Sequence, residues 1–223
     1  MYLNISHSII YTRGVVKMFS FLTSIINSIF GKKKNVSLGL YGAPNAGKTT
    51  LANKICMDWV GEPLGVVSEV PHETRVVQKK ERVEIKYSGR SLSMNLLDMP
   101  GISTKVDYKE FTKHGIKKED AQIRAKEATK GIIEAIKWLE NVDAALVVMD
   151  STEDPYTQVN ITILGNLEAR KIPVILIANK TDLAKSNKNK IEDAFPQYKV
   201  IAISAKDGGN IDNLYKEIFS RVK

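Results

Sequence analysis

The sequence is poor in the residues that staple small domains or bind metals: its 223 residues include one cysteine and three histidines. Cys56 has no partner for an internal disulfide, which excludes a disulfide-stapled secreted domain. The histidines, His7, His72 and His114, show no spacing typical of a metal centre. No apolar run reaches the roughly 20 residues needed to cross a bilayer, and no secretory cleavage pattern follows the N-terminus. We therefore expect a cytoplasmic protein.

Acidic residues are outnumbered by basic ones, 25 to 33, which gives a net charge of +8 and a pI near 9.4. Such a charge allows attraction to RNA or to an anionic membrane surface, and it is equally typical of a protein with many solvated lysines. Sequence motifs of nucleic-acid-binding modules are absent, so charge alone does not identify a partner.

Strand and helix patterns alternate along most of the chain. Helical spacing of apolar residues marks 48–59, 118–139 and 211–222, and short apolar or alternating runs mark six strands, at 36–41, 82–87, 91–97, 144–149, 174–178 and 200–203. The last three strands belong to three strand-helix units, so we also expect a helix after 144–149 and another after 174–178. The second and third strands, joined by Ser88 and Gly89, form a predicted hairpin. We predict an α/β fold: a six-stranded, mainly parallel sheet with one antiparallel edge strand and helices on both faces.

A glycine-rich loop follows the first strand and precedes the first helix, the context that a phosphate-binding P-loop requires. Its backbone N–H groups and the following helix N-terminus are expected to surround phosphates, with Lys48 reaching the β- and γ-phosphates and the Thr49 hydroxyl binding Mg²⁺. The residues assigned to this loop and to the start of its helix are Gly42, Ala43, Pro44, Asn45, Ala46, Gly47, Lys48, Thr49 and Thr50.

Two further segments are expected beside the phosphates. Asp98, in the DMPG segment that ends the third strand, is predicted to hold Mg²⁺ through a water, and the Gly101 N–H to face the γ-phosphate. A switch driven by a bound nucleotide also needs a hydroxyl that reaches Mg²⁺ only when the γ-phosphate is present. Thr74 is our candidate, with Ser68 as the alternative. Lys48, Thr74 and Gly101 form the predicted catalytic set.

A base-binding segment follows the fifth strand as NKTD. The Asp182 carboxylate can accept hydrogen bonds from guanine N1 and N2 together, an arrangement that rejects adenine. Asn179 can bond N7 and hold neighbouring loops, while the Lys180 stem covers the base. The SAK segment after the last strand, Ser204, Ala205 and Lys206, completes the pocket, with the Ala205 N–H donating to guanine O6. These positions predict a site for GTP or GDP at the carboxyl ends of the strands.

The ordered set GAPNAGKT, Thr74, DMPG, NKTD and SAK resembles the Era group of translation-factor-related P-loop GTPases over residues 35–223. The resemblance implies a switch that hydrolyses GTP to GDP and phosphate with Mg²⁺. In some members the asparagine of the PNxGK loop helps bind K⁺, so Asn45 either binds K⁺ or fixes the loop. Ras-like proteins carry a glutamine at the position of Ile102; its absence predicts slow hydrolysis that K⁺, a GTP-dependent dimer or a partner accelerates.

The sequence departs from Era in two places. Era carries an RNA-binding KH domain after its GTPase domain, whereas this sequence ends at Lys223, so we expect the KH domain to be lacking. The second switch is long, running from Ile102 through Tyr108, Phe111 and His114 to a helix at Lys118. We expect the switch loops to contact a protein partner, and ribosomal RNA is a second candidate partner.

The first 34 residues form a predicted N-terminal extension. Apolar residues within 18–30 follow helical spacing, and three lysines follow Gly31. This amphipathic helix either lies on the inner membrane surface or packs on protein. The first possibility gives the alternative function, a membrane-peripheral GTP-regulated binding module with slow or incidental hydrolysis. Translation can begin at Met1 or at Met18.

Overall fold

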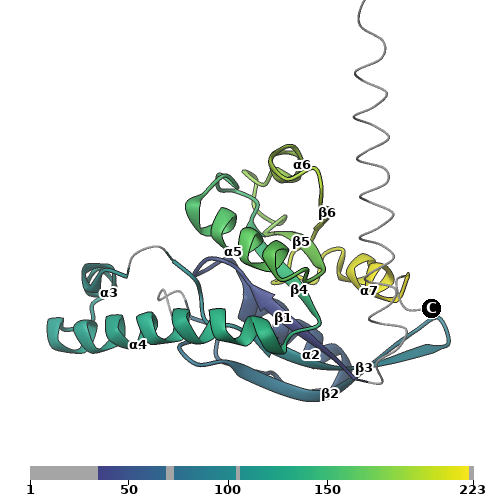
Figure 1. Cartoon of the computed structure of the whole chain (residues 1–223), viewed down its shortest axis with the longest axis horizontal. Helices are drawn as coiled ribbons and strands as arrows, with labels where there is room; N and C mark the ends of the chain where they lie inside the picture. The colour runs from purple at the N-terminus through teal and green to yellow at the C-terminus, as the bar shows by residue number, and fades with distance from the viewer. Residues whose placement is uncertain (1–34, 69–72, 104–105, 221–223) are drawn as a thin grey trace, which may run out of the picture.

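The protein is described by a computed structural model, which covers residues 35–68, 73–103 and 106–220. Six strands form one sheet in the order β2-β3-β1-β4-β5-β6 (Figure 1). The β2 strand pairs antiparallel with β3, and all other neighbours are parallel. The sheet and its edge strand therefore match the predicted fold class. The strands are β1 (Val36–Tyr41), β2 (Gln78–Tyr87), β3 (Arg90–Asp98), β4 (Ala144–Asp150), β5 (Val174–Asn179) and β6 (Lys199–Ala202).

Both faces of the sheet are buried, because side chains alternate between two hydrophobic clusters along each central strand. In β4, Leu146 and Val148 join one cluster, whereas Val147 and Met149 join the other. The first cluster contains residues of α2 (Lys48–Trp59) and α7 (Ile211–Ser220). The second contains residues of α4 (Lys118–Lys137), the 3-10 helix Trp138–Asn141, α5 (Gln158–Ala169) and α6 (Lys188–Ala194).

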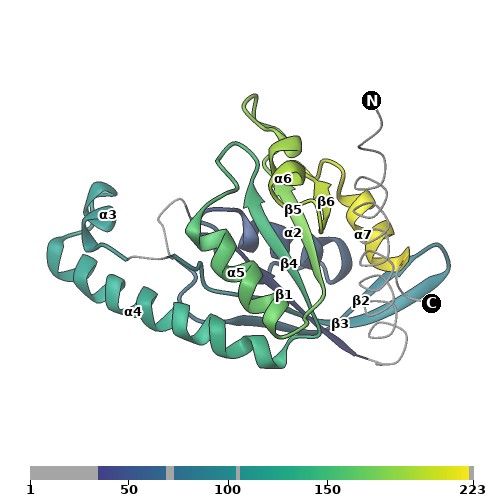
Figure 2. The same ribbon diagram turned by 45° about the horizontal axis from the view of Figure 1, so that its top comes forward.

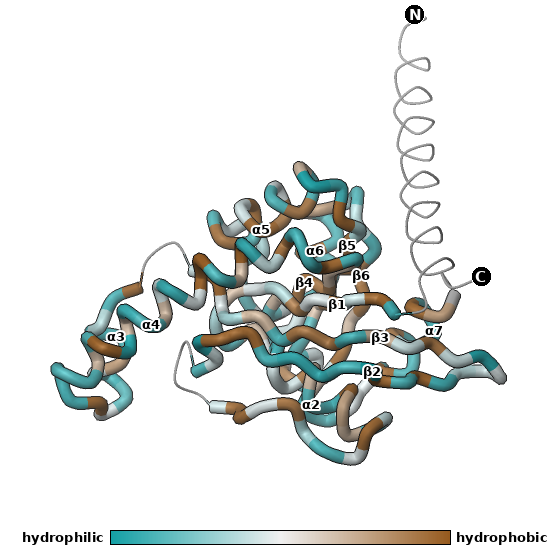
Figure 3. Tube along the Cα trace, turned by 60° about the horizontal axis from the view of Figure 1, so that its bottom comes forward, coloured by the Kyte–Doolittle hydropathy of each residue, from teal (hydrophilic) through white to brown (hydrophobic). Residues whose placement is uncertain are grey.

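Helix α4 serves two different parts of the molecule. Its C-terminal half joins the core, where Ala135 is fully buried. Its N-terminal half extends beyond the sheet and carries α3 (Tyr108–Lys113) at its far end (Figures 1 and 2). There Phe111 packs against Ala121 and Ala128 in a small separate cluster. Hydrophilic and hydrophobic residues alternate along both helices (Figure 3).

Most predicted elements occur within a few residues of their expected bounds. The β1 strand and α2 coincide with the prediction, and the 118–139 helix ends at Lys137 before a turn of 3-10 helix. The exception is the second switch, where α3 was not predicted. The Asp107 carboxylate caps α3 by accepting from the Lys109 N–H at 2.9 Å, and this short-range capping signal was present in the sequence.

The predicted amphipathic helix at 18–30 and the rest of the N-terminal extension lie outside the described residues. The His72 position and the loop positions 104–105 also lie outside them. Among the helices that the structure describes, none combines the length and the apolar character needed to cross a bilayer.

Candidate nucleotide site

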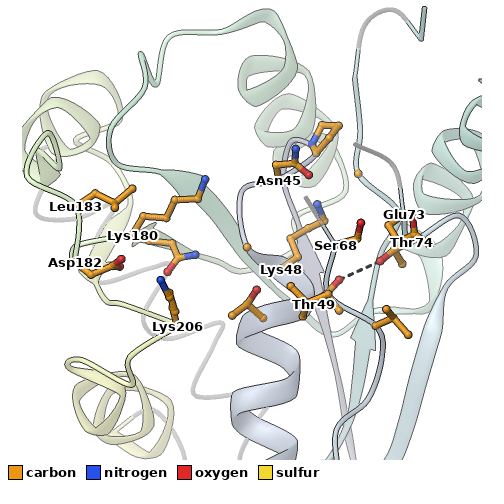
Figure 4. A pocket seen from close by; sticks show the side chains of 17 residues that line it. Asn45, Lys48, Thr49, Ser68, Glu73, Thr74, Lys180, Asp182, Leu183 and Lys206 are labelled. Carbon is orange, nitrogen blue, oxygen red and sulfur yellow. Dashed lines mark hydrogen bonds between the residues drawn. The ribbon is translucent and has the colours of Figure 1, made fainter. Parts of the chain in front are cut away.

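A cavity of about 590 Å³ lies at the carboxyl ends of the strands and is lined by the predicted segments (Figure 4). One side presents the P-loop together with Ser68, Glu73 and Thr74, and the opposite side presents Lys180, Asp182 and Lys206. Twelve predicted site residues line the cavity: Pro44, Asn45, Gly47, Lys48, Thr49, Thr50, Thr74, Gly101, Asn179, Lys180, Asp182 and Lys206. The other six predicted site residues are not among the residues that line the cavity: Gly42, Ala43, Ala46, Asp98, Ser204 and Ala205.

The P-loop depends on glycine at both of its ends. Gly42 has a φ of 151°, and a Cβ there would lie 2.2 Å from the Val148 carbonyl oxygen on β4. Gly47, which caps α2, has a φ of 95°, and its Cβ would lie 2.1 Å from Nδ2 of Asn179. No other residue fits these positions without displacing a neighbour. The two glycines therefore allow the loop to lie close against β4 and against the NKTD segment.

Thr49 and Thr74 line one end of the cavity and meet there with Asp98, although the three residues come from separate segments. The Thr49 hydroxyl donates to Asp98 Oδ2 at 2.6 Å. The same hydroxyl lies 3.0 Å from the Thr74 hydroxyl (Figure 4). Asp98 is completely buried, and its Oδ1 has no hydrogen-bond partner among the described residues. Burial raises the pKa of Asp98, while Lys48 and the Thr49 hydrogen bond act in the opposite direction. An unsatisfied buried carboxylate oxygen beside two hydroxyls fits the oxygen ligands that Mg²⁺ prefers.

Lys48 is 5% exposed, and its ammonium donates to the Ala43 carbonyl oxygen at 2.8 Å. Burial lowers its pKa to about 8, although the Asp98 carboxylate favours the charged form. Removal of an ammonium group from water is costly, and an anionic ligand in the cavity would offset that cost. The site is therefore arranged to bind a group of negative charge beside Lys48.

The pKa of Lys48 predicts how nucleotide affinity depends on pH. Bound phosphates favour the ammonium form, so binding takes up a proton when Lys48 is neutral beforehand, and affinity falls as pH rises through about 8. We expect the Kd for GDP, measured with a fluorescent analogue in EDTA, to rise about tenfold between about pH 7 and pH 9. Circular dichroism over the same range controls for unfolding. A constant Kd would contradict the assignment of Lys48.

Asn179 joins the two halves of the cavity. Its side chain is 3% exposed; Nδ2 donates to the Ala46 carbonyl oxygen at 2.9 Å, and Oδ1 accepts from the Ala205 N–H at 2.9 Å. The P-loop, the NKTD segment and the SAK segment are therefore tied through one amide. A second N–H remains on Nδ2 for a ligand, since an amide nitrogen carries two donors.

The hydrogen bond to Asn179 modifies the expectation for Ala205. We predicted that its backbone N–H donates to guanine O6, but in this structure the N–H already donates to Asn179 Oδ1. A backbone amide has a single proton, so contact with O6 requires that this bond be shared or exchanged. The contact with O6 stays a prediction.

Asp182 and Lys180 are oriented by side-chain contacts that the sequence did not predict. The Ser204 hydroxyl donates to Asp182 Oδ1 at 2.7 Å, so Ser204 positions the predicted guanine acceptor. The Lys180 ammonium donates to Asp150 Oδ2 at 2.5 Å across the ends of β5 and β4. Burial alone would raise the pKa of Asp150, but hydrogen bonds from Lys180 and Thr152 outweigh burial and lower it. This ion pair holds the Lys180 ammonium on the side of the cavity that also carries Asp182 and Lys206.

Gly101 and Ile102 place the second switch against the P-loop. A Cβ on Gly101 would lie 2.9 Å from the Pro44 Cα, so only glycine permits this approach. The Ile102 N–H donates to the Gly42 carbonyl oxygen at 3.1 Å, and the Ile102 side chain, 6% exposed, belongs to the second hydrophobic cluster. The side chain after Gly101 therefore packs in the core and does not line the cavity.

Four lining residues were not singled out from the sequence: Val66, Val67, Glu73 and Leu183. The three apolar residues among them are exposed: Val66 by 71%, Val67 by 55% and Leu183 by 46%. Glu73 is adjacent to the predicted switch threonine and was overlooked, because a charged residue in a loop normally points to solvent. No local sequence pattern identifies the three apolar residues, since loop packing depends on distant segments.

The P-loop, the buried Asp98 and the NKTD segment at the carboxyl ends of a mainly parallel sheet define a P-loop nucleotide-binding protein. The sequence profile described as "50S ribosome-binding GTPase" matches residues 37–180. The chain belongs to this GTPase family, and within it the chain is Era-like.

Curated relatives agree with this assignment. GTPase Era of Alkaliphilus oremlandii (strain OhILAs) is 31% identical over 184 residues, which cover 78% of this chain and 52% of the relative. GTPase Era of Clostridioides difficile (strain 630) is 30% identical over 83% of this chain and 55% of the relative. The chain thus spans about half the length of the curated Era relatives it matches.

Solved structures show the same fold. Era in complex with MgGDPNP and a segment of 16S ribosomal RNA superimposes with a TM-score of 0.63 at 25% identity, over 85% of this chain and 57% of that one. An Aquifex aeolicus Era variant bound to GDP and AlF4⁻ gives a TM-score of 0.64 at 24% identity, over 86% of this chain and 58% of that one.

Proposed function

We propose that the protein is a GTP-binding switch that hydrolyses GTP to GDP and phosphate, with residues 35–223 as the GTPase domain and 1–34 as an extension. The observation that carries this proposal is the meeting of Thr49, Thr74 and Asp98 at one end of the cavity. Thr49 and Thr74 would hold Mg²⁺ together with Asp98. When bound, Mg²⁺ would neutralise charge on the β- and γ-phosphates.

The residues act on the reaction by position and charge. Lys48 stabilises negative charge as the bond between the γ-phosphorus and the β–γ bridging oxygen breaks. The Gly101 N–H and Thr74 hold their loops against the γ-phosphate, and loss of that phosphate releases them. Asp182 selects guanine, and Lys180 covers it. Asn179 keeps the two halves of the site in register.

Hydrolysis is proposed to be slow in the isolated protein, because the buried Ile102 cannot orient the attacking water. K⁺ at Asn45, a GTP-dependent dimer, or a partner on the switch loops would supply the missing function. Ribosomal RNA is the partner class that a relative supports, since Era has been solved with 16S ribosomal RNA. The membrane-peripheral alternative rests on residues outside the described part of the chain, and no contact described here favours it.

The test compares Thr74→Ala with Ser68→Ala, because both residues line the cavity and both are hydroxyl candidates. Thr74→Ala should weaken binding of a non-hydrolysable GTP analogue about tenfold or more, leave GDP binding nearly unchanged and abolish hydrolysis. Ser68→Ala should retain discrimination between the two nucleotides. Full discrimination and hydrolysis in Thr74→Ala would refute the assignment. Fast hydrolysis by the monomer in Na⁺ would refute the need for a further component.

A further inference from the structure

The first switch loop contacts helix α4 on both sides of Thr74. The Arg75 guanidinium pairs with Glu127 at 2.5 Å, and Arg124 pairs with Glu73 at 3.4 Å. The Arg75 guanidinium also lies 3.7 Å from the Glu73 carboxylate. The side chains of Glu73, Arg75, Arg124 and Glu127 therefore form one network of charges. We propose that Arg124 and Glu127 of α4 are positioning residues for Thr74, an inference that rests on the proposed switch function of that threonine.

The spacing on the helix supports a common role. Positions 124 and 127 are three residues apart, so their side chains lie on one face of α4. The two partners, Glu73 and Arg75, are the immediate neighbours of Thr74 in the chain. Loop residues held at both neighbouring positions leave Thr74 little freedom, and its hydroxyl lies 3.0 Å from that of Thr49 (Figure 4).

A glycine on the same helix brings the backbone of the loop into contact. A Cβ on Gly131 would lie 2.5 Å from the Arg75 carbonyl oxygen and 3.1 Å from the Pro100 Cβ. Both switch segments therefore press on one turn of α4. Glycine inside a helix costs about 1 kcal/mol relative to alanine, and this close approach explains why it is tolerated.

The strength with which the network holds the first switch loop depends on how exposed its charged side chains are to water. The side chains of Arg75 and Glu127 are 26% and 45% exposed, and a cavity of about 510 Å³ adjoins the network. Water weakens such pairs, so the network biases the loop toward its ordered position and does not lock it. A ligand that binds only when the loop is ordered then binds more tightly, whereas a ligand that does not contact the loop is unaffected. We expect GTP to require the ordered loop and GDP to bind without it.

The test measures the affinities for GDP and for a non-hydrolysable GTP analogue with Mg²⁺ present. Glu127→Arg should lower the GTP-to-GDP affinity ratio about fivefold through the GTP analogue alone, and unchanged GDP binding reports an intact fold. The matched control is Glu119→Arg, the same charge change at an exposed position of the same helix. It should leave the ratio unchanged. Equal ratios for Glu127→Arg and wild type would overturn the proposal.

A double-mutant cycle separates positioning from a general charge effect. Glu127→Ala should reduce the ratio about threefold in the wild-type background and have no further effect when Arg75 is alanine. Additive losses would overturn the proposed route through Arg75. Thr74→Ala in the same assay distinguishes the two levels of argument. If Thr74→Ala removes discrimination between GTP and GDP but Glu127→Arg leaves it intact, the positioning proposal is wrong and the switch role of Thr74 stands. If both variants keep full discrimination, the switch role of Thr74 is wrong as well.

Discussion

Replacement of Asp182 by asparagine is expected to weaken GDP binding by roughly 100-fold or more. The carboxylate would accept two hydrogen bonds from guanine N1 and N2, and each bond to a charged acceptor contributes about 1.5–3 kcal/mol. Asparagine has no charge and presents an N–H toward a donor. Ser204 holds the side chain at 2.7 Å, so the substituted amide would stay in the same place. The measurement is the Kd for GDP by titration calorimetry.

Asp207→Asn provides the matched control for Asp182→Asn. Asp207 belongs to the neighbouring SAK loop, where its N–H donates to the Ser204 hydroxyl, and its side chain is exposed. The same loss of charge at this position should leave the Kd within about twofold, because exposed charges interact weakly. Equal effects of the two variants would show that overall charge, and not the guanine contact, determines affinity.

Gly47→Ala is expected to reduce affinity for GDP and for GTP by roughly 100-fold, since small displacements in a preorganised site are costly. The added Cβ would lie 2.1 Å from Nδ2 of Asn179. That nitrogen cannot move freely, because its amide is buried and ties Ala46 to Ala205. The substitution therefore separates the phosphate half from the base half of the cavity. Nucleotide titration and thermal unfolding measure the two consequences.

Gly89→Ala separates this steric effect from backbone strain. Gly89 has a φ of 77°, similar to the 95° of Gly47, but nothing lies within 4 Å of a Cβ built there. The Gly89→Ala substitution should lower the free energy of unfolding by about 1 kcal/mol, the cost of a left-handed conformation for alanine, and leave nucleotide affinity unchanged. If Gly47→Ala behaved like Gly89→Ala, the contact with Asn179 would not be essential to the site.

The motifs predicted most of the residues that line the cavity, because each motif sits directly at the end of a strand or the start of a helix. The order of these elements, with five parallel strands, brings their carboxyl ends to one edge of the sheet. GAPNAGKT, DMPG and NKTD could therefore be assigned to one pocket without coordinates. The α3 helix was missed because its six residues are too short for a periodic signal.

The residues that hold the motifs in place were not predictable in the same way. Ser204 on Asp182, Asp150 on Lys180, and Glu127 on Arg75 are pairs whose members lie 22, 30 and 52 residues apart. Polar side chains at such separations have many candidate partners, and their choice depends on how the elements pack. The hydrogen bond from the Ala205 N–H to Asn179 Oδ1 is another contact between distant segments that the sequence did not predict.

The sequence alone determined the fold class, the family and the segments that line the cavity, because these follow from hydrophobic periodicity and from contiguous motifs. Tertiary structure alone decided which side chains support those segments. It placed Thr74 beside Thr49, directed Ile102 into the core, and set Gly131 of α4 against both switch segments. The physical reason is that periodicity is a local property, whereas hydrogen bonds, ion pairs and close approaches between distant segments exist only after the chain has packed.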